Sequence, residues 1–397
     1  MSVADFLLNL SQQFETGSIT LQPAACLNAR FRTAGCSHCA DVCPAEAAIT
    51  VVNGRPALDR DACLHCGLCL HRCPTGAFTR PDGFSRKLTR TAATVSAGPV
   101  ELVCPQQPNP ALGAVPHAIQ TQRCLAAVSA ATLLELTAGG KDIWLDDRYC
   151  AGCPLGTVRP EMVQTAAEAN GWAALLADSG TVRLRSEQPE LPAAPRPVLD
   201  ATRPSLSRRG LFGVFKPPAA PAADTLTEAA KLINPGRSIA PSNRLPQTLP
   251  VERAAILNIL AHQTPATPEA PPRPGAQLPL VDVQIDPARC TACGLCAKFC
   301  PTGALKFLSD DRTFTLAFQP DSCLGQLCNI CRSACPEQAV TTSPAKAASG
   351  KRPLAAGELT LCTRCQTPIA RGPELSPLCF ACRPRENSAD LLASLSK

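Results

Sequence analysis

Large aromatic side chains and long apolar runs are both scarce in this sequence. Aromatic residues make up only 4% of its 397 residues, so we expect modest hydrophobic cores that need another means of stabilisation. No apolar stretch approaches the roughly 20 residues of a membrane-spanning helix. The first residues, MSVADFLLNLSQQFETG, lack the basic start and long apolar core of a secretory signal, and they fit a short amphipathic helix over residues 1–17. We therefore expect a cytoplasmic protein without a membrane span.

The fingerprints of several enzyme and nucleic-acid-binding classes are also missing. The sequence contains no Gly-rich dinucleotide loop, no P-loop and no C-x3-C-x2-C motif of the radical-SAM type. Its formal charge is +6, but the basic residues are scattered and few aromatic residues accompany them. We therefore expect no nucleic-acid partner, and the sequence leaves open whether the chain is an enzyme.

Cysteine, in contrast, is abundant, with 24 residues in the chain. Thiols in a reducing compartment favour metal binding over disulfides. The cysteines fall into groups whose sizes are multiples of four: eight within residues 26–73, four within 104–153, eight within 290–335 and four within 362–382. Four is the ligand number of most iron–sulfur clusters and structural zinc sites, so the grouping predicts several metal centres.

Proline is abundant too, and much of it lies in one interval. Residues 188–278 include PELPAAPRPVLDATRP, KPPAAPAAD and PATPEAPPRPGAQLP, which cannot bury enough surface to fold alone. Two pieces of the interval, TLTEAAKLI and PVERAAILNILAHQ, have helical apolar spacing, and Pro250 suits a first-turn position. We expect a linker with short helices that dock on a neighbouring domain.

The same interval contains SLSRRGLFGVFK, with twin arginines at Arg208 and Arg209. This segment resembles the core of a twin-arginine export signal, but such signals lie at the N-terminus. Its internal position favours a basic amphipathic piece that docks on a domain or a partner. Ferredoxin-type accessory proteins of molybdenum oxidoreductases carry similar segments.

The two eight-cysteine groups are built from one repeated motif. Residues 63–74 and 290–301 both read C-x2-C-x2-C-x3-C-P, and residues 26–44 and 323–336 repeat it with extra residues between the first two cysteines. Three thiolates on such a loop can surround one cluster, and the fourth, just before proline, reaches a second cluster. Gly67 would let backbone N–H groups approach the cluster sulfides, as would Gly294. Zinc knuckles and disulfides are the alternatives.

These motifs, with tails such as CPTGAF and CPTGAL, resemble bacterial two-cluster ferredoxins over residues 20–80 and 280–342. The resemblance implies four 4Fe–4S clusters with crossed ligation. The implied ligand sets are Cys26, Cys36, Cys39 and Cys73; Cys63, Cys66, Cys69 and Cys43; Cys290, Cys293, Cys296 and Cys335; and Cys323, Cys328, Cys331 and Cys300. The two insertions are the departures from the ferredoxin pattern.

The segment between the two modules has a different pattern. VELVC, HAIQTQRC, DIWLDD and TVRLR read as strands, and LAAVSAATLLELTAGG and PEMVQTAAEANGWAALLAD read as helices. Strands that alternate with helices predict a parallel sheet covered by helices. Its cysteines follow strand ends, so they can meet at one edge of the sheet, where α/β proteins bind ligands.

These four middle cysteines are Cys104, Cys124, Cys150 and Cys153. Their placement is similar to that in the small iron–sulfur subunit of hydrogenase and heterodisulfide reductase complexes, where strand-end cysteines bind a 2Fe–2S centre. The resemblance implies an additional iron–sulfur centre. A buried set of structural thiols and a labile disulfide are the alternatives.

The last four cysteines are Cys362, Cys365, Cys379 and Cys382, spaced C-x2-C-x13-C-x2-C. This spacing resembles a zinc ribbon, and rubredoxin-type iron is the rival because a site with four sulfur ligands accepts either metal. Rubredoxin knuckles usually have glycine after the second cysteine, whereas Gln366 and Arg383 stand here, which favours zinc.

The predicted fold is an α+β multidomain chain, in which two ferredoxin-like dicluster modules flank a small α/β parallel-sheet domain and a four-cysteine knuckle lies near the C-terminus. The expected segments are an N-terminal helix (1–17), a dicluster module (18–94), an α/β domain (95–187), a linker (188–278), a dicluster module (279–345), a zinc-ribbon-like module (355–385) and a tail (386–397).

The predicted function is electron transfer through iron–sulfur clusters, as a carrier or as a wiring subunit of a larger redox enzyme. Redox proteins are the expected partners, with a molybdenum oxidoreductase or a hydrogenase-type complex as candidates. Two alternatives remain: a maturation or docking factor for a molybdenum oxidoreductase, and a redox enzyme whose active centre lies at the middle cysteines.

Overall fold

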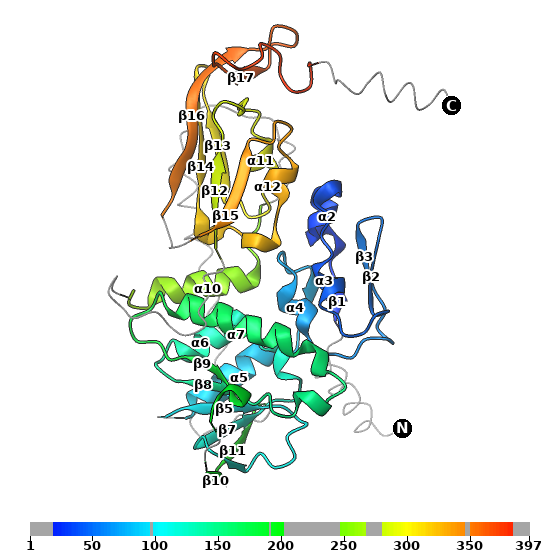
Figure 1. The fold of residues 1–397 in the computed structure, drawn as a ribbon, viewed down its shortest axis with the longest axis vertical. Helices are drawn as coiled ribbons and strands as arrows, with labels where there is room; N and C mark the ends of the chain where they lie inside the picture. The colour runs from blue at the N-terminus through cyan, green and yellow to red at the C-terminus, as the bar shows by residue number, and fades with distance from the viewer. Residues whose placement is uncertain are drawn as a thin grey trace, which may run out of the picture.

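The computed structural model describes residues 19–95, 98–189, 192–201, 247–266, 280–345 and 350–383. The expected N-terminal helix over 1–17, the piece TLTEAAKLI, the twin arginines Arg208 and Arg209 and the tail 386–397 lie outside these residues. In Figure 1 the central sheet lies at one end of the molecule and the second ferredoxin module at the other, with the first module beside them.

The first ferredoxin module is made of short elements around its cysteine loops. The two-residue strands β1 and β4, one from each end of the module, pair antiparallel. The hairpin β2–β3 turns at Asn53 and Gly54, which both have positive φ. The module ends in α5, which leads into the central domain. Its elements are β1 (Thr20–Leu21), α2 (Leu27–Arg30), α3 (His38–Asp41), β2 (Ile49–Val52), β3 (Arg55–Leu58), α4 (Leu68–Arg72), β4 (Phe78–Thr79) and α5 (Phe84–Ala93).

The central domain has a five-stranded parallel sheet in the order β11-β7-β5-β8-β9, in which β11 is Val198–Asp200. Every strand that the sequence predicted here is present, and helices α6 and α7 follow β7 and β8, so the prediction of a parallel sheet with helices packed on it is confirmed. Ser129 accepts a hydrogen bond from the N–H of Thr132 at 3.2 Å and begins α6. The elements are β5 (Val100–Val103), β6 (Leu112–Gly113), β7 (His117–Gln120), α6 (Ala130–Thr137), β8 (Ile143–Leu145), α7 (Arg159–Ala173) and β9 (Val182–Leu184).

The central domain reaches further along the chain than the sequence indicated. Within the interval 188–278 assigned to a linker, β10 (Ala194–Pro195) pairs with β6, and β11 (Val198–Asp200) forms the edge strand of the sheet beside β7. A strand this short and next to prolines has no period-2 pattern to reveal it. The predicted helix PVERAAILNILAHQ is α10 (Val251–His262), with Pro250 at its N-cap, and it packs on the central domain through Ile256.

The second ferredoxin module repeats the plan of the first on a larger scale. Its terminal strands β12 and β15 pair over five residues, and β13, β14, β16 and β17 form a separate four-stranded sheet. Strand β16 runs from this sheet directly into the last cysteine motif. The elements are β12 (Val281–Ile285), α11 (Leu295–Phe299), β13 (Leu305–Ser309), β14 (Thr313–Phe318), α12 (Ile330–Ser333), β15 (Val340–Pro344), β16 (Arg352–Leu361) and β17 (Pro368–Ala370).

Short 3-10 turns occupy several loops, and all of these turns except η6 lie in loops that carry cysteines. They are η1 (Pro23–Ala25), η2 (Arg32–Ala34), η3 (Leu125–Ala127), η4 (Cys150–Gly152), η5 (Gly156–Val158), η6 (Arg185–Glu187), η7 (Pro320–Ser322) and η8 (Gly325–Leu327).

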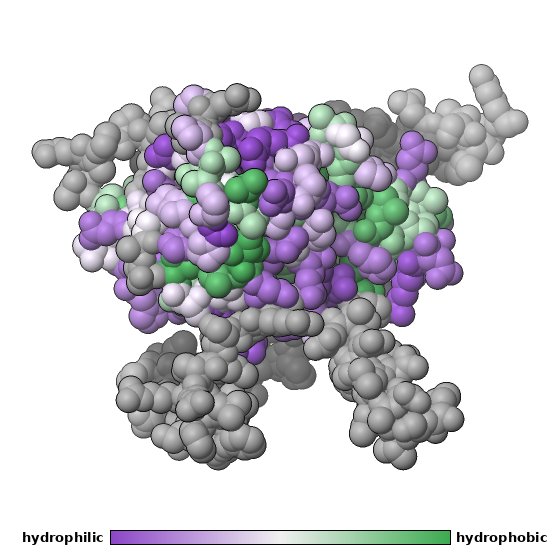
Figure 2. Space-filling model, turned by 90° about the horizontal axis from the view of Figure 1, so that it is seen from below, coloured by the Kyte–Doolittle hydropathy of each residue, from purple (hydrophilic) through white to green (hydrophobic). Residues whose placement is uncertain are grey.

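Seen from the end where the central sheet lies, the visible surface is mostly hydrophilic, with hydrophobic residues gathered in separate patches (Figure 2). No helix in the described part of the chain has the length and apolar character needed to cross a membrane.

Candidate metal centres

The two tightest cysteine loops adopt the same backbone conformation. In the loop 63–69 the left-handed residues are His65 (φ 55°) and Gly67 (φ 83°), and in the loop 290–296 they are Ala292 (φ 55°) and Gly294 (φ 68°). Two left-handed residues at matching positions turn the chain sharply around one centre. The repeat in sequence is therefore a repeat in structure. Each loop continues into a five-residue helix, α4 or α11, that ends at the cysteine before proline.

Glycine is required in these loops for a structural reason that the sequence did not reveal. A Cβ on Gly67 would lie 2.8 Å from the Cβ of Ala127 in the central domain, and one on Gly294 would lie 3.2 Å from the ring of Phe307. The sequence attributed both glycines to close approach of the backbone to a cluster. Positive φ and contact with neighbouring side chains are the constraints that the structure places on them.

The cysteines of the first module gather into two sets that cross the motifs, and each set lines a cavity. One cavity is lined by Cys26, Cys36, Cys39 and Cys73, and the other by Cys43, Cys63, Cys66 and Cys69. In each, the cysteine before proline comes from the other motif. This is the arrangement implied by the ferredoxin resemblance.

The second module has the same crossed arrangement. One of its cavities is lined by Cys290, Cys293, Cys296 and Cys335. The remaining cysteines lie together as well. Burial raises the pKa of the Cys328 thiol, and the charges of the nearby Cys323, Cys331 and Cys300 raise it further. We call the four groups set I (with Cys26), set II (with Cys43), set III (with Cys290) and set IV (with Cys300).

Backbone N–H groups point at many of these sulfurs. The N–H of Ala77 donates to Cys73 Sγ and that of Ala339 to Cys335 Sγ, both at 3.3 Å, and His65 N–H donates to Cys63 Sγ at 3.5 Å. Such bonds stabilise the thiolate form. Burial acts in the opposite direction and raises the pKa of Cys39 and of Cys69 to about 12. Thiolates therefore need a metal charge in these cavities, so the residues fit iron–sulfur clusters.

The four middle cysteines also meet, at the carboxyl-terminal edge of the parallel sheet. Cys104 follows β5 directly, Cys124 lies four residues beyond β7, and the other two lie in the turn η4 and just after it. Burial, followed by the charges of Cys104, Cys66 and Cys153, raises the pKa of Cys124 to about 11. Burial together with the charges of Cys124 and its neighbours raises the pKa of Cys150 to about 12.

The loop that carries Cys150 is fixed by two buried carboxylates. Asp146 accepts from Gln107 Nε2 at 2.6 Å, and Asp147 accepts from Arg159 Nε and from the N–H of Ser186, both at 2.8 Å. Burial opposes the ionisation of Asp147, but the hydrogen bonds from Ser186 and Arg159 outweigh it and lower the pKa of the carboxyl. The sequence analysis interpreted DIWLDD only as a strand and did not identify the two aspartates as residues that fix this loop.

The middle cysteines lie next to set II. Cys66 belongs to the same hydrophobic cluster as Leu125 and Ala126, and Cys104, Cys124 and Cys150 pack against that cluster. His71, in α4, shares a 2.8 Å hydrogen bond with the carbonyl of Ala126. Burial lowers the pKa of His71 to about 4, so the neutral ring donates to this carbonyl. The first module and the central domain therefore meet directly between their cysteine sets.

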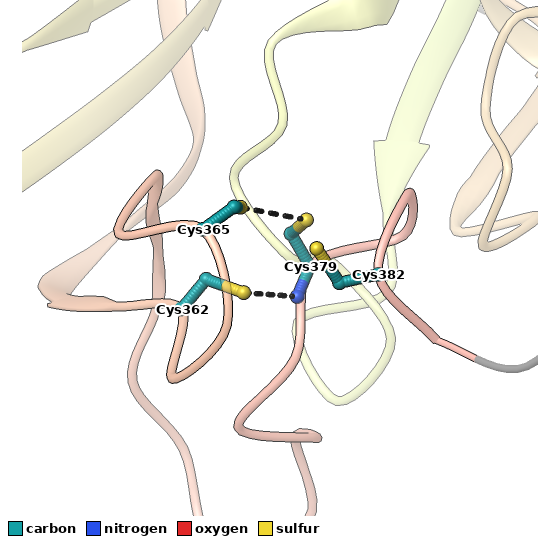
Figure 3. Close-up of side chains that lie close together, drawn as sticks. All are labelled: Cys362, Cys365, Cys379 and Cys382. Atoms are coloured by element: carbon teal, nitrogen blue, oxygen red, sulfur yellow. Dashed lines mark hydrogen bonds between the residues drawn. The ribbon is translucent and has the colours of Figure 1, made fainter.

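The last four cysteines form a much tighter group. Their Sγ atoms all lie within 4.8 Å of one another, and Cys365 Sγ is 3.6 Å from Cys379 Sγ (Figure 3). A tetrahedral ion with metal–sulfur bonds of about 2.3 Å separates its sulfurs by roughly 3.8 Å, so the spacing suits one ion. Hydrogen bonds from the N–H groups of Cys379 and Cys365 lower the pKa of Cys362 to about 6.

Among the described residues, this is the one group of ligand atoms close enough for a single metal ion. The middle four and sets I to IV are more widely spaced, as the ligands of a multi-iron cluster would be. Gln366 adopts φ 58°, the conformation that glycine usually takes at this point of a knuckle. The backbone at Gln366 therefore has the same shape as a knuckle with glycine, so the lack of glycine does not distinguish a zinc site from an iron site.

Several arginines near the cysteines were not singled out from the sequence. The charges of Cys300 and Cys328 act on Arg30, that of Cys323 acts on Arg253, and that of Cys63 acts on Arg80. Each arginine lies far from its cysteine in sequence or outside the motif, so no spacing rule could have identified it. Burial lowers the pKa of each guanidinium.

Comparison with known families supports the ferredoxin modules. Residues 34–78 match the family described as the 4Fe-4S dicluster domain, and residues 283–306 match the 4Fe-4S binding domain. The first match includes every cysteine from Cys36 to Cys73, and the second includes those from Cys290 to Cys300. A search of curated proteins found no significant match. The prediction of ferredoxin-type iron–sulfur domains is confirmed.

Proposed function

We propose that this chain, which carries ferredoxin-type 4Fe–4S domains, is a carrier or wiring subunit that supplies electrons to a larger redox enzyme. A 4Fe–4S cluster exchanges single electrons at low potential, and the protein supplies burial and hydrogen bonds that set that potential. The observation that carries this proposal is the crossed gathering of sets I to IV, with set II beside the middle cysteines.

The ligands that we propose are the four crossed sets. In the first module they are Cys26, Cys36, Cys39 and Cys73 for one cluster and Cys43, Cys63, Cys66 and Cys69 for the other. In the second module they are Cys290, Cys293, Cys296 and Cys335 for one cluster and Cys300, Cys323, Cys328 and Cys331 for the other.

The experiment is metal and sulfide analysis of full-length protein purified without oxygen, followed by reduction with dithionite and low-temperature EPR. Four clusters of this type require about 16 Fe per chain, before any iron at the middle cysteines. A carrier takes up and returns electrons reversibly without turning over a substrate. Colourless protein, or protein whose cysteines hold only zinc, would refute the proposal.

We also propose a multi-iron centre at Cys104, Cys124, Cys150 and Cys153. Support comes from their convergence at one sheet edge and from a hydrogen bond of the N–H of Leu155 to Cys153 Sγ at 3.4 Å, which is the same type of bond that the ferredoxin cysteines accept. Their spacing is wider than that of a single-ion site. A Cys150→Ala variant should lose the iron of this centre and keep that of sets I to IV. The exposed neighbour Ala151 provides the control variant Ala151→Ser, which should lose neither.

The position of the middle cysteines also favours one second candidate, a redox enzyme with its active centre there. The carboxyl-terminal edge of a parallel sheet is where α/β proteins bind substrates. An enzyme would lose turnover in Cys150→Ala while its ferredoxin clusters stay reducible. The maturation or docking role would depend on residues 207–212, which lie outside the described residues. A molybdenum oxidoreductase and a hydrogenase-type complex remain the candidate partners.

For the C-terminal knuckle we propose structural zinc in a reducing, cytoplasmic setting. Four thiolates within 4.8 Å of one another close the coordination sphere and leave no position for chemistry. The proposed role of this ion is to fasten residues 362–382 to the end of β16.

A further inference from the structure

The two ferredoxin modules contact each other through a helix end. Arg30, the last residue of α2, donates from Nε to the carbonyl of Phe299 at 2.8 Å and from an η nitrogen to the carbonyl of Cys300 at 3.1 Å. These carbonyls lie at the C-terminal end of α11, where helix carbonyls lack partners within the helix. The first module therefore caps a helix of the second.

An apolar cluster lies beside this cap. Phe31 and Phe299 pack edge to face with ring centroids 5.0 Å apart. Leu27 and Ala34 of the first module form one buried cluster with Leu324 and Ile330 of the second. Cys36 of set I and Cys328 of set IV both pack against this cluster. An apolar contact therefore lies between two cysteine sets that belong to different modules.

A third contact also joins the two modules. His38 Nε2 lies 3.2 Å from the carbonyl of Leu327. His38 stands between Cys36 and Cys39, and Leu327 immediately precedes Cys328. This contact thus joins residues beside cysteines of set I and set IV, and the Arg30 contact ends on the backbone of Cys300 in set IV. The partners in the Arg30 contact are 269 positions apart in sequence, so tertiary contacts, and not the motifs, bring them together.

We propose that Arg30 is a positioning residue that holds set I against set IV, so that the two ferredoxin modules act as one electron-transfer unit and not as two independent ferredoxins. This inference rests on the proposed function of the two sets. Arg30 also brings a positive charge to Cys300 and Cys328, since its guanidinium contacts the backbone of the first. A positive charge stabilises the more negative reduced state of a cluster at set IV and raises its reduction potential.

The test uses the full chain, prepared without oxygen, in three variants. Arg30→Ala removes both the hydrogen bonds and the charge, while Arg30→Lys keeps the charge and loses the two-pronged contact. Gln247→Ala is the matched control, because Gln247 Nε2 donates to the carbonyl of Ala297 in the same helix α11 at 3.0 Å, and this hydrogen bond involves no residue of the first module. Iron content is measured first for each.

Two readouts separate position from charge. Hydrogen exchange of residues 27–34 and 295–301 should become roughly thirtyfold faster in Arg30→Ala, which loses two hydrogen bonds worth about 1 kcal/mol each. It should become roughly fivefold faster in Arg30→Lys, whose ammonium group can keep one of them. A redox titration followed by EPR should show one cluster at lower potential in Arg30→Ala and near its original potential in Arg30→Lys. Gln247→Ala should leave the potentials and the exchange of residues 27–34 as in the wild type.

The inference is overturned if Arg30→Ala retains its iron and neither the potentials nor the exchange of residues 27–34 changes. If Arg30→Ala loses iron, Arg30→Lys decides the matter through exchange alone: unchanged exchange overturns the inference, and faster exchange in both segments supports it. Failure of the proposed function has a different signature, because the wild-type protein would then lack iron or fail to be reduced reversibly.

Discussion

At the scale of single residues, charged side chains hold the cysteine-bearing parts together. Arg72, only 5% exposed, lies one residue before Cys73 and pairs with Glu161 at 2.6 Å and with Glu168 at 2.9 Å in α7. It therefore joins the first module to the central domain. Desolvation of a buried ion pair is costly, and removal of one partner leaves the remaining charges buried without compensation.

Replacement of Arg72 by alanine should reduce the free energy of unfolding by about 2–4 kcal/mol, because two carboxylates that are mostly buried lose their partner. The measurement is urea denaturation followed by the visible absorbance of the clusters. Arg90→Ala, at an exposed position of α5, is the control and should change the stability by less than about 0.5 kcal/mol. Equal stabilities of the two variants would contradict this role of Arg72.

Gly67 offers a second test at the residue scale. Alanine there has to adopt φ 83° and place its Cβ 2.8 Å from the Cβ of Ala127, so the central domain must shift. Gly76→Ala is the matched control, since it has φ 65° and no atom within 4 Å of the added Cβ. The control should cost about 1–2 kcal/mol of stability, and Gly67→Ala should cost more in the same denaturation assay. If Gly67→Ala loses no more stability than the control, the contact with Ala127 does not constrain this position.

At the scale of elements, α10 connects the central domain to the second module. Ile256 of α10 packs with Trp172 and Leu280 in one buried cluster, and the guanidinium of Arg253 lies 4.9 Å from the centre of the Trp172 ring. Just before the helix, the N–H of Thr248 donates to the carbonyl of Pro301 at 2.9 Å. Helix α10 is thus a structural element of two domains and not a free part of a linker.

The first turn of α10 provides a pH-dependent prediction. Burial raises the pKa of Glu252 despite hydrogen bonds from Ser129 and from the N–H of Ala131. The folded state therefore holds the proton more tightly than the unfolded chain, and this contribution to stability is present below the unfolded pKa and lost as the pH rises through the folded one. Glu252→Gln keeps an acceptor without the charge, so it should raise the Tm at pH 7.5.

The difference in Tm between Glu252→Gln and wild type should shrink as the pH falls through the raised pKa of the native carboxyl, which then takes up its proton. Thermal unfolding at several pH values measures it. Glu135→Gln, at an exposed position of α6, controls for the general effect of removing one negative charge. A Tm difference that is the same at every pH would show that the charge of Glu252 is not the cause.

At the scale of the whole molecule, the contacts place the cysteine groups in a definite order. Set III adjoins the knuckle, since the N–H of Ala370 donates to the carbonyl of Thr291 at 3.0 Å and Arg383 pairs with Glu337 at 2.9 Å. Glu337 lines the cavity of set III. Set IV meets set I across the Phe31–Phe299 contact, and set II meets the middle cysteines. The arrangement runs from the C-terminal knuckle to the edge of the central sheet.

Removal of one knuckle ligand should leave this arrangement largely intact. Cys365→Ser is expected to lose about one metal ion per chain, because a closed site of four thiolates tolerates the loss of one poorly, and to retain the iron of sets I to IV. Elemental analysis by mass spectrometry measures both. Arg364→Ala, at the neighbouring exposed position, is the control. If Cys365→Ser loses iron and no zinc, the knuckle holds iron and the zinc assignment is wrong.

The sequence alone determined the chemistry of this protein and much of its local structure. Soft thiolates spaced C-x2-C-x2-C-x3-C-P can turn around only a small centre, so the motif predicts both the ligands and the short helix after them. Alternating apolar runs likewise predicted β5, β7, β8 and β9. These features depend on neighbours within a few residues, which is the range that a spacing rule covers.

Only the tertiary structure decided which cysteine groups lie next to each other. The contact of Arg30 with Cys300, that of Cys66 with the middle set, and the pairing of β11 with β7 all join distant segments. Such contacts arise from packing and from the need of buried carbonyls and charges for partners, and no local pattern encodes the choice of partner. The order of the cysteine groups therefore follows from the fold, while the proposed number and type of metal centres rest on the motifs.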